Sequence, residues 1–150
     1  RNVAAFVLDH LGRILICERL DVSDAWQLPQ GGVEDGESPL EAVYRELREE
    51  IGTSAVEVIT QLPTPICYEW PQSLWERGYR GQEQEYFLVH LRDGAQIELS
   101  SHLATPEFRS YKWVTALEFE KMVSGFKREA YLQALESFKK LFPDLIREHD

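Results

Sequence analysis

The stretch "GGVEDGESPLEAVYRELREEIG", residues 31 to 52, decides the fold. Ser38 is followed by a proline and then by Glu41, which together form a capping box with proline at the first helical position. Apolar residues then recur at helical spacing until Gly52, a residue type that favours the left-handed C-terminal cap. These signals predict a helix from Pro39 to Ile51.

One face of this predicted helix is crowded with acidic side chains. At 100° per residue, Glu46, Glu49 and Glu50 fall within an arc of roughly 100°. Like charges at this spacing repel one another, whereas carboxylates are the oxygen ligands that suit Mg²⁺ or Mn²⁺. The face is therefore interpreted as half of a metal site. The alternative is a solvated helix face that Arg45 and Arg48 partly neutralise.

Composition limits the class of protein. The 150 residues are 43% hydrophobic and carry a formal net charge of -10. This size and apolar content predict one domain spanning residues 1–150, and the acidic balance excludes a protein that holds nucleic acid mainly through a basic surface. No long apolar run is present, so a soluble chain is expected, and Arg1 in place of Met suggests a trimmed N-terminus. Cys17 and Cys67 are expected to be buried free thiols in a reducing cytoplasm.

The rest of the chain reads mainly as strands. Two β-rich runs flank "DHLG" at residues 9–12 and predict a hairpin, whereas residues 22–32 are expected to break regular structure. Thr115 and Glu118 form a second capping box, and residues 126–142 have the pattern of an amphipathic helix. This order predicts an α/β fold in which helices pack on a mixed β-sheet. Strands are expected at residues 3–8, 13–18, 55–62, 66–69, 84–91 and 108–114.

The helix and its flanks resemble the Nudix box. The matching residues are two glycines, five charged residues and one aliphatic residue at the spacing of the family: Gly31, Glu37, Arg45, Glu46, Leu47, Glu49, Glu50 and Gly52. Thr53 stands where the family usually has a bulky aliphatic residue, a difference that bears on packing and not on chemistry. The resemblance implies the Nudix α/β/α sandwich, a mixed sheet between helices. It also implies hydrolysis of a nucleoside diphosphate linked to another moiety.

The same resemblance gives roles to the box residues. It implies that Arg45 pairs with Glu37 to brace the loop before the helix. It also implies that the backbones of Gly31 and Gly32 approach metal and phosphate, because glycine presents no side chain. The metal-binding and catalytic residues that it implies on the helix are Glu46, Glu49 and Glu50.

Four further segments resemble the bacterial RNA pyrophosphohydrolase branch of the family, which also contains the dinucleoside polyphosphate hydrolases. They are "WQLPQGG" at 26–32, "YRGQEQEYFL" at 79–88, "TPEF" at 105–108 and "FKREAY" at 126–131. In this branch the glutamate of "PEF", here Glu107, reaches the metal site as a ligand or candidate base. The alternative for Glu107 is an ordinary exposed loop residue. The general base is left open among Glu49, Glu50 and Glu107, since bases are assigned by geometry before pKa.

The branch resemblance also suggests substrate-binding residues. Arg19, Phe126 and Lys127 are implied to lie near the phosphate and base pocket. A lysine meets a phosphate as a point charge, and Phe126, Tyr79 or Arg19 could stack on a base. Each has an ordinary alternative as a surface charge or, for Phe126, as a core or hinge residue. Strand alternation favours Gln84 as a residue that faces the cleft.

These features predict a metal-dependent pyrophosphohydrolase with Mg²⁺, or Mn²⁺, as cofactor. It would remove pyrophosphate from 5′-triphosphorylated RNA, cleave dinucleoside polyphosphates such as diadenosine tetraphosphate, or do both. One alternative is a housecleaning hydrolase of nucleoside triphosphates or nucleotide sugars. Another is a non-catalytic nucleotide- or RNA-binding module, although such modules typically lose box glutamates that this chain keeps. The expected partner is a nucleotide polyphosphate or an RNA 5′ end in the cytoplasm, with no membrane and no DNA.

Overall fold

The structure is a computed structural model that describes residues 1–70, 81–100 and 105–150. Most of its helices and strands fall where the sequence predicts them. In chain order they are β1 (Asn2–Leu8), β2 (Ile14–Arg19), β3 (Trp26–Gln27), β4 (Gln30–Gly32), α1 (Pro39–Ile51), β5 (Val56–Gln61), β6 (Ile66–Glu69), β7 (Gly81–Leu91), β8 (Phe108–Val114), α2 (Ala116–Met122) and α3 (Arg128–Leu141).

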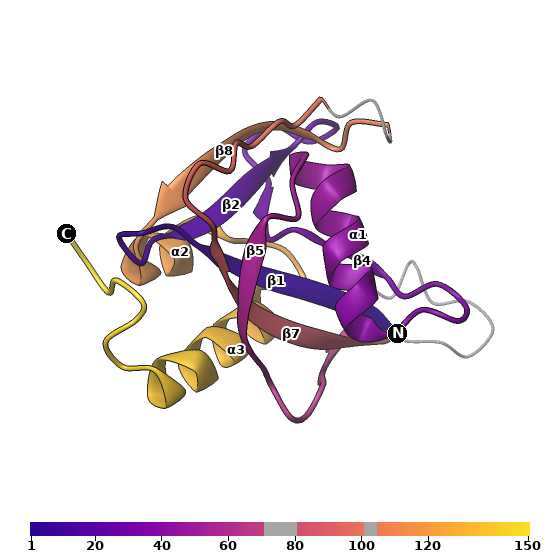
Figure 1. Cartoon of the computed structure of the whole chain (residues 1–150). Coiled ribbons are helices and arrows are strands. Elements are labelled where there is room, and N and C mark those ends of the chain that lie inside the picture. The colour runs from indigo at the N-terminus through magenta and orange to yellow at the C-terminus, as the bar shows by residue number, and fades with distance from the viewer. Residues whose placement is uncertain (71–80, 101–104) are drawn as a thin grey trace.

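Strands β1 and β7 form the centre of the sheet (Figure 1). They run parallel, in register from Asn2 opposite Gln84 to Leu8 opposite His90. The other described pairings are antiparallel: β7 pairs with β5 and β6, β1 with β2 and β4, and β2 with β3 and β8. The described part of the chain therefore forms a mixed sheet, as predicted, because one parallel pair lies among antiparallel ones.

Strand β1 separates two hydrophobic cores because its side chains alternate between the faces of the sheet. Phe6 and Leu8 belong to the core that α2 and α3 cover. Val3, Ala5 and Val7 belong to the core that α1 covers. Figure 1 shows α1 on one side of the sheet and α2 and α3 on the other. This is the α/β/α sandwich that the sequence predicts.

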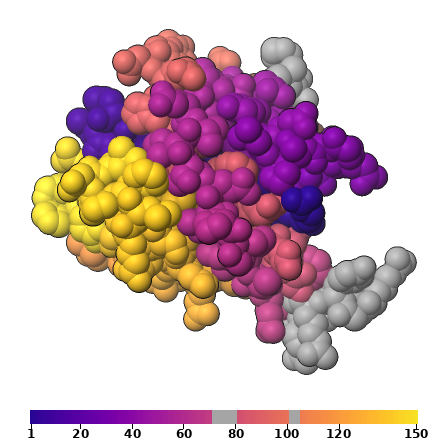
Figure 2. Space-filling model, turned by 60° about the horizontal axis from the view of Figure 1, so that its bottom comes forward, coloured from indigo at the N-terminus to yellow at the C-terminus, as the bar shows by residue number. Residues whose placement is uncertain are grey.

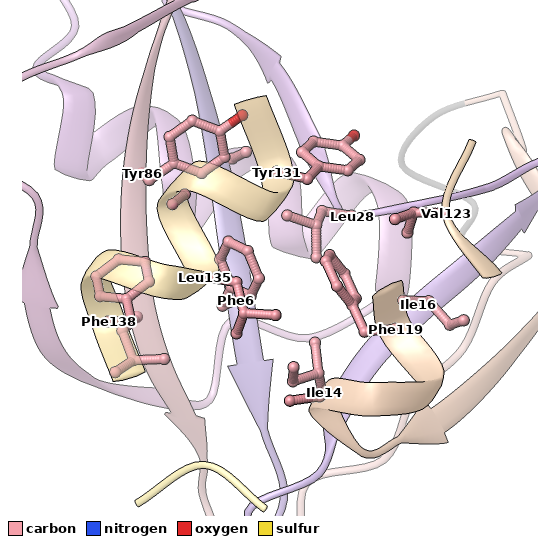
Figure 3. Close-up of a cluster of buried hydrophobic side chains, with 14 of the residues drawn as sticks. Phe6, Ile14, Ile16, Leu28, Tyr86, Phe119, Val123, Tyr131, Leu135 and Phe138 are labelled. Carbon is pink, nitrogen blue, oxygen red and sulfur yellow. The ribbon is translucent and has the colours of Figure 1, made fainter. Parts of the chain in front are cut away.

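Aromatic rings fill much of the core beneath α2 and α3 (Figure 3). The ring centroid of Phe6 lies 5.4 Å from that of Phe119 and 5.5 Å from that of Phe138. Burying one such side chain contributes about 2 kcal/mol. Tyr86 and Tyr131 lie at one end of this cluster, and their hydroxyl oxygens point away from its apolar centre.

Helix α1 begins and ends at the residues that the sequence predicts. The Ser38 hydroxyl accepts a 3.1 Å hydrogen bond from the Glu41 N–H, and the Glu41 carboxylate accepts a 3.0 Å bond from the Ser38 N–H. At the other end Gly52 has a φ of 77°. A β-carbon there would lie 2.6 Å from the carbonyl oxygen of Glu98, so both conformation and space require glycine.

Two predictions about the strands were wrong. Residues 22–32 were expected to be irregular, but β3 pairs with β2 and β4 pairs with β1. Strands β3 and β4 are regular because they pair with neighbouring strands. The glycines and proline of this segment give no sign of that pairing. Cys67 was expected to be buried and is exposed on β6, whereas Cys17 is buried; both are free thiols.

Figure 2 shows α3 beside the segment that joins β5 to β6. A shallow surface hollow lies between the two. The hollow has a volume of about 430 Å³ and is lined by residues such as Pro63, Pro65 and Leu141. It shares no lining residue with the cleft described below. Among the described residues, no helix is both long enough and apolar enough to cross a membrane.

Candidate active site

The carboxylate of Glu50 lies inside the protein, near the C-terminal end of α1. Only 4% of the residue is exposed. The backbone N–H of Gln30 donates a 2.7 Å hydrogen bond to Oε1, whereas Oε2 is buried without a hydrogen-bond partner among the described residues. Burial first, and then the neighbouring Glu107 and Glu46 carboxyls, raise the pKa of Glu50 well above its usual range. A buried carboxylate oxygen that lacks a donor is a position where a cation stabilises the protein.

Glu46 packs directly over the first glycine of the box. A β-carbon at Gly31 would lie 2.1 Å from the carboxyl carbon of Glu46, so any other residue would displace this carboxylate. Burial raises the pKa of Glu46, although the Arg45 guanidinium acts in the opposite direction. A β-carbon at Gly32 would meet no heavy atom closer than 3.9 Å. The two glycines therefore differ: Gly31 makes room for a carboxylate, and Gly32 leaves open space.

Arg45 connects the loop before α1 to the acidic face of the helix. Its Nε and Nη2 donate to the two carboxylate oxygens of Glu37 at 2.8 and 3.0 Å. Nη2 also donates to the Gly32 carbonyl at 2.7 Å, and Nη1 donates to Glu46 at 2.8 Å and to Glu49 at 3.3 Å. The Arg45 guanidinium lowers the pKa of Glu37 to about 2. The predicted pair between Arg45 and Glu37 is thus present in the structure as a two-bond contact.

Glu49 and Glu107 lie at the edges of this acidic region. The Glu49 side chain is 35% exposed, and Glu107 is exposed in the loop before β8, where its carbonyl accepts a 2.8 Å hydrogen bond from the Leu20 N–H. Within residues 1–70, 81–100 and 105–150, no three Asp, Glu, His or Cys side chains form a group that could hold a metal ion. The carboxylates of Glu46 and Glu49 both accept from Nη1 of Arg45, so a guanidinium lies between them in this structure.

A cleft of about 470 Å³ opens beside Glu107. Residues from several distant segments form its walls: Arg19, Leu20, Asp21, Gln27, Gln30, Pro106, Glu107, Phe108 and Lys127. Arg19 is exposed in part and makes a two-bond ion pair with Asp21, at 2.9 and 2.6 Å. The cleft therefore brings the predicted Arg19, Glu107 and Lys127 together. Positive and negative side chains share it, so it is suited to a phosphate group near a cation.

Lys127 enters this cleft from the turn before α3. Its Nζ lies 5.5 Å from the ring centroid of Tyr68 and 5.8 Å from that of Phe126. Burial, and then the charge of Arg19, lower the pKa of Lys127 to about 8. Phe126 is 44% exposed, and it lines a small hollow that adjoins the cleft. An exposed aromatic ring beside a lysine can stack on a nucleobase.

Gln84 does not face the cleft, contrary to the expectation from strand alternation. It is fully buried, and its amide contacts only other buried polar groups: Nε2 donates to Asn2 and Gln30, and Oε1 accepts from Tyr86. The alternation of side chains along β7 could not show which of them face the cleft, because helices cover both faces of this sheet. Tyr79 lies outside the described residues.

Three residues in or near the cleft were not predicted. Gln30 supplies the donor to Glu50, Tyr68 supports Lys127 and Asp21 holds Arg19. Gln30 directly precedes the first box glycine, so its position in the sequence was the available signal. Nothing local marked Tyr68, because its contact joins β6 to the turn before α3.

The residues present suit a divalent metal ion. Glu50 offers a buried oxygen without a partner, and Glu46 and Glu107 lie close enough to raise its pKa. Carboxylate oxygens are the donors that hard divalent cations prefer. The chemistry of the donor set thus fits such an ion.

The sandwich, the box helix and the adjoining cleft are the features of a Nudix domain. The NUDIX domain family matches residues 1–134, and the chain belongs to this family. Proteins of this family generally use divalent metal ions.

Curated relatives are similar over nearly the whole chain. The RNA pyrophosphohydrolase of one Helicobacter pylori strain is 43% identical over 145 residues, which is 93% of this chain and 92% of that protein. The RNA pyrophosphohydrolase of a Nitratiruptor species is 44% identical over 145 residues, with the same coverage. That of a Campylobacter jejuni strain is 39% identical over 144 residues, covering 92% of this chain and 91% of that protein.

Solved structures share the fold at lower identity. The E. coli dihydroneopterin triphosphate pyrophosphohydrolase aligns with a TM-score of 0.73 and 23% identity, covering 91% of this chain and 92% of that one. A C. elegans Ap4A hydrolase complex aligns with a TM-score of 0.67 and 17% identity, covering 95% of this chain and all of that one. At these identities the likeness concerns the fold alone.

Proposed function

We propose that the chain is a metal-dependent RNA pyrophosphohydrolase that hydrolyses the 5′-triphosphate end of RNA to a 5′-monophosphate and pyrophosphate. The observation that carries this proposal is the buried Glu50 carboxylate, with one unpartnered oxygen, on the Nudix box helix. Similarity to RNA pyrophosphohydrolases at 39 to 44% identity over most of the chain supports the choice of substrate. The proposal treats residues 1–150 as one Nudix domain that acts in the cytoplasm.

Glu46, Glu49, Glu50 and Glu107 are proposed to hold Mg²⁺, for which Mn²⁺ could substitute. When bound, such an ion lowers the pKa of a coordinated water and neutralises phosphate charge as the anhydride bond breaks. Arg45 then has a positioning role, because it ties Glu46 and Glu49 to Glu37 and to the Gly32 carbonyl. The backbone of Gly31 permits the close packing of Glu46.

The chain's own residues bind the substrate and move the proton. Lys127 and Arg19 are proposed to contact the phosphates, and Phe126 to stack on the first base. Glu49, Glu50 and Glu107 are the candidates for the carboxylate that accepts the proton of the attacking water; of these, Glu107 lies close enough to Glu50 to raise its pKa. Asp21 holds Arg19 in the cleft wall through two hydrogen bonds.

Recognition is proposed to stop at the RNA terminus. A cleft of about 470 Å³ has the volume of a small-molecule site, and the chain carries a net charge of -10. There is no broad basic composition to bind a long phosphate backbone by counterion release. The affinity for triphosphorylated RNA should therefore change little once the first few nucleotides are present.

A substrate panel tests the proposal. Purified protein with Mg²⁺ is incubated with triphosphorylated RNA, diadenosine tetraphosphate, nucleoside triphosphates and nucleotide sugars at equal concentrations, and kcat/KM is measured for each. The proposal predicts release of pyrophosphate from RNA with the highest kcat/KM, and it allows cleavage of diadenosine tetraphosphate as a second activity. A preference for nucleoside triphosphates or nucleotide sugars over both would overturn it.

A further inference from the structure

A chain of buried hydrogen bonds runs beneath the cleft and ends on Glu50. The Tyr131 hydroxyl, on α3, donates to the side-chain oxygen of Gln30. The Gln84 amide, on β7, donates to the same oxygen at 3.3 Å. The backbone N–H of Gln30 in turn donates to Glu50 at 2.7 Å. Gln30 is therefore held by two side chains from distant elements while it orients the carboxylate.

In this network each hydrogen-bond donor of Gln84 meets an acceptor, and its acceptor meets a donor. The Gln84 Nε2 also donates to the Asn2 side chain at 2.6 Å, and Gln84 Oε1 accepts from the Tyr86 hydroxyl at 2.5 Å. The amide nitrogen of Gln84 thus meets only acceptors, and its oxygen meets a donor. Side chains from β1, β4, β7, α1 and α3 take part, so the arrangement joins five elements around Gln30 on β4.

The polar character of this network needs a reason beyond packing. Tyr131 and Gln84 are 1% and 0% exposed, and burying such groups costs free energy unless every partner is satisfied. Tyr131 and Tyr86 border an otherwise apolar cluster, and their hydroxyls point out of it (Figure 3). Apolar side chains could fill the same space, so what the polar groups add is a fixed geometry at Gln30.

The network also links the two sides of the cleft. The backbone N–H of Tyr131 donates a 3.0 Å hydrogen bond to the carbonyl of Lys127, one helical turn earlier. Tyr131, whose hydroxyl holds Gln30, is thus hydrogen-bonded to Lys127, the half-buried lysine of the cleft. A displacement of Tyr131 would change the position of Lys127 relative to Glu50.

We propose that Tyr131 and Gln84 are positioning residues that fix the Glu50 carboxylate through Gln30; neither lines the cleft beside Glu107, and Tyr131 lines only the small hollow that adjoins it. This inference rests on the proposed function, because it assigns the network to the hydrolytic site. Partners that orient metal-binding side chains typically contribute 10- to 100-fold to metal affinity or to rate.

Tyr131→Phe tests the inference, since it removes one hydroxyl and keeps the ring. We expect kcat on triphosphorylated RNA to fall by about tenfold or more, with KM changed by less than about threefold. Mn²⁺ affinity, measured without RNA by electron paramagnetic resonance, should weaken by a similar factor. Gln84→Met removes the other donor to the same Gln30 oxygen and should lower kcat and Mn²⁺ affinity in the same way. This variant tests the inference if Tyr131→Phe does not fold.

Leu135→Val is the matched control, because Leu135 lies on the same helix, is fully buried in the same core and makes no polar contact with Gln30. It should lower the melting temperature while leaving kcat and Mn²⁺ affinity unchanged. The inference is overturned if a folded Tyr131→Phe or Gln84→Met retains both wild-type values. It is equally overturned if Leu135→Val lowers them at a matched loss of stability. If the wild-type protein does not hydrolyse triphosphorylated RNA, the proposed function is wrong. In that case the Mn²⁺ affinities of the variants still test whether the network positions Glu50.

Discussion

The carboxylate of Glu46 occupies the space that a side chain at Gly31 would need, since a β-carbon there would lie 2.1 Å from the Glu46 carboxyl carbon. Gly31 therefore has a steric role that differs from its predicted approach to metal and phosphate. It lets the half-buried Glu46 on α1 pack closely against β4.

Gly31→Ala should consequently displace Glu46 and weaken divalent metal binding by about tenfold or more. Calorimetric titration with Mn²⁺ checks this. Gly32→Ala serves as the comparison, because its β-carbon would meet nothing closer than 3.9 Å and should leave the Mn²⁺ affinity within about twofold. Equal affinities for the two variants would show that Glu46 is not constrained by Gly31.

Glu50→Gln should remove activity without unfolding the protein. In the folded state the pKa of Glu50 is raised, so ionisation of this carboxyl costs stability as pH rises above its ordinary value of 4.5. A neutral amide avoids that cost, and the variant should melt at the same or a higher temperature at pH 7 in EDTA. It should also lose the stabilisation that added Mg²⁺ gives the wild type. Glu57→Gln, an exposed change on β5, is the control and should retain the Mg²⁺ effect. A Mg²⁺-dependent rise in melting temperature that persists in Glu50→Gln would contradict the assigned role.

The titration of Lys127 should make kcat/KM fall at alkaline pH. Its pKa is lowered from 10.5 to about 8, so the side chain is a cation below this pH and becomes neutral as pH rises through it. A neutral amine binds phosphate poorly, and kcat/KM for triphosphorylated RNA should therefore fall above pH 8. In Lys127→Arg the charge persists, so the fall near pH 8 should disappear even if the overall rate is lower. The prediction fails if both proteins show the same decline.

The ion pair between Arg45 and Glu37 should stabilise the folded protein at neutral pH, and this contribution should be lost at acid pH. The pKa of Glu37 is about 2 in the folded protein, below its ordinary value of 4.5. Its contribution is therefore complete above pH 4.5 and is lost as pH falls toward 2. Melting curves of Glu37→Gln and wild type should differ at pH 7 and converge near pH 2. Glu34→Gln is the control, since Glu34 is exposed and 3.8 Å from Arg45, and it should change the melting temperature little at any pH.

The features that the sequence predicted well are those whose signals are local. The bounds of α1 follow from the Ser38 capping box and Gly52, and the same short segment carries the acidic face. Arg45 is also bonded to Glu37, as the family resemblance implies, whereas the packing of Glu46 on Gly31 was not predicted.

The features that were missed depend on contacts between distant segments. The order of β3 and β4 comes from pairing with β2 and β1, and the burial of Gln84 follows from helices on both faces of the sheet. The hydrogen bond from Tyr131 to Gln30 joins residues 101 positions apart. No local pattern encodes such a contact, because it forms only when the whole sandwich has assembled.

The most direct test of the central claim is the rate at which triphosphorylated RNA is converted to 5′-monophosphate RNA as Mg²⁺ is titrated, in the wild type and in Glu50→Gln. We predict a saturable rise with Mg²⁺ in the wild type, no conversion in EDTA, and a rate at least about a hundredfold lower in Glu50→Gln at every Mg²⁺ concentration. Conversion that proceeds equally well in EDTA, or that is as fast in Glu50→Gln as in the wild type, would contradict the account.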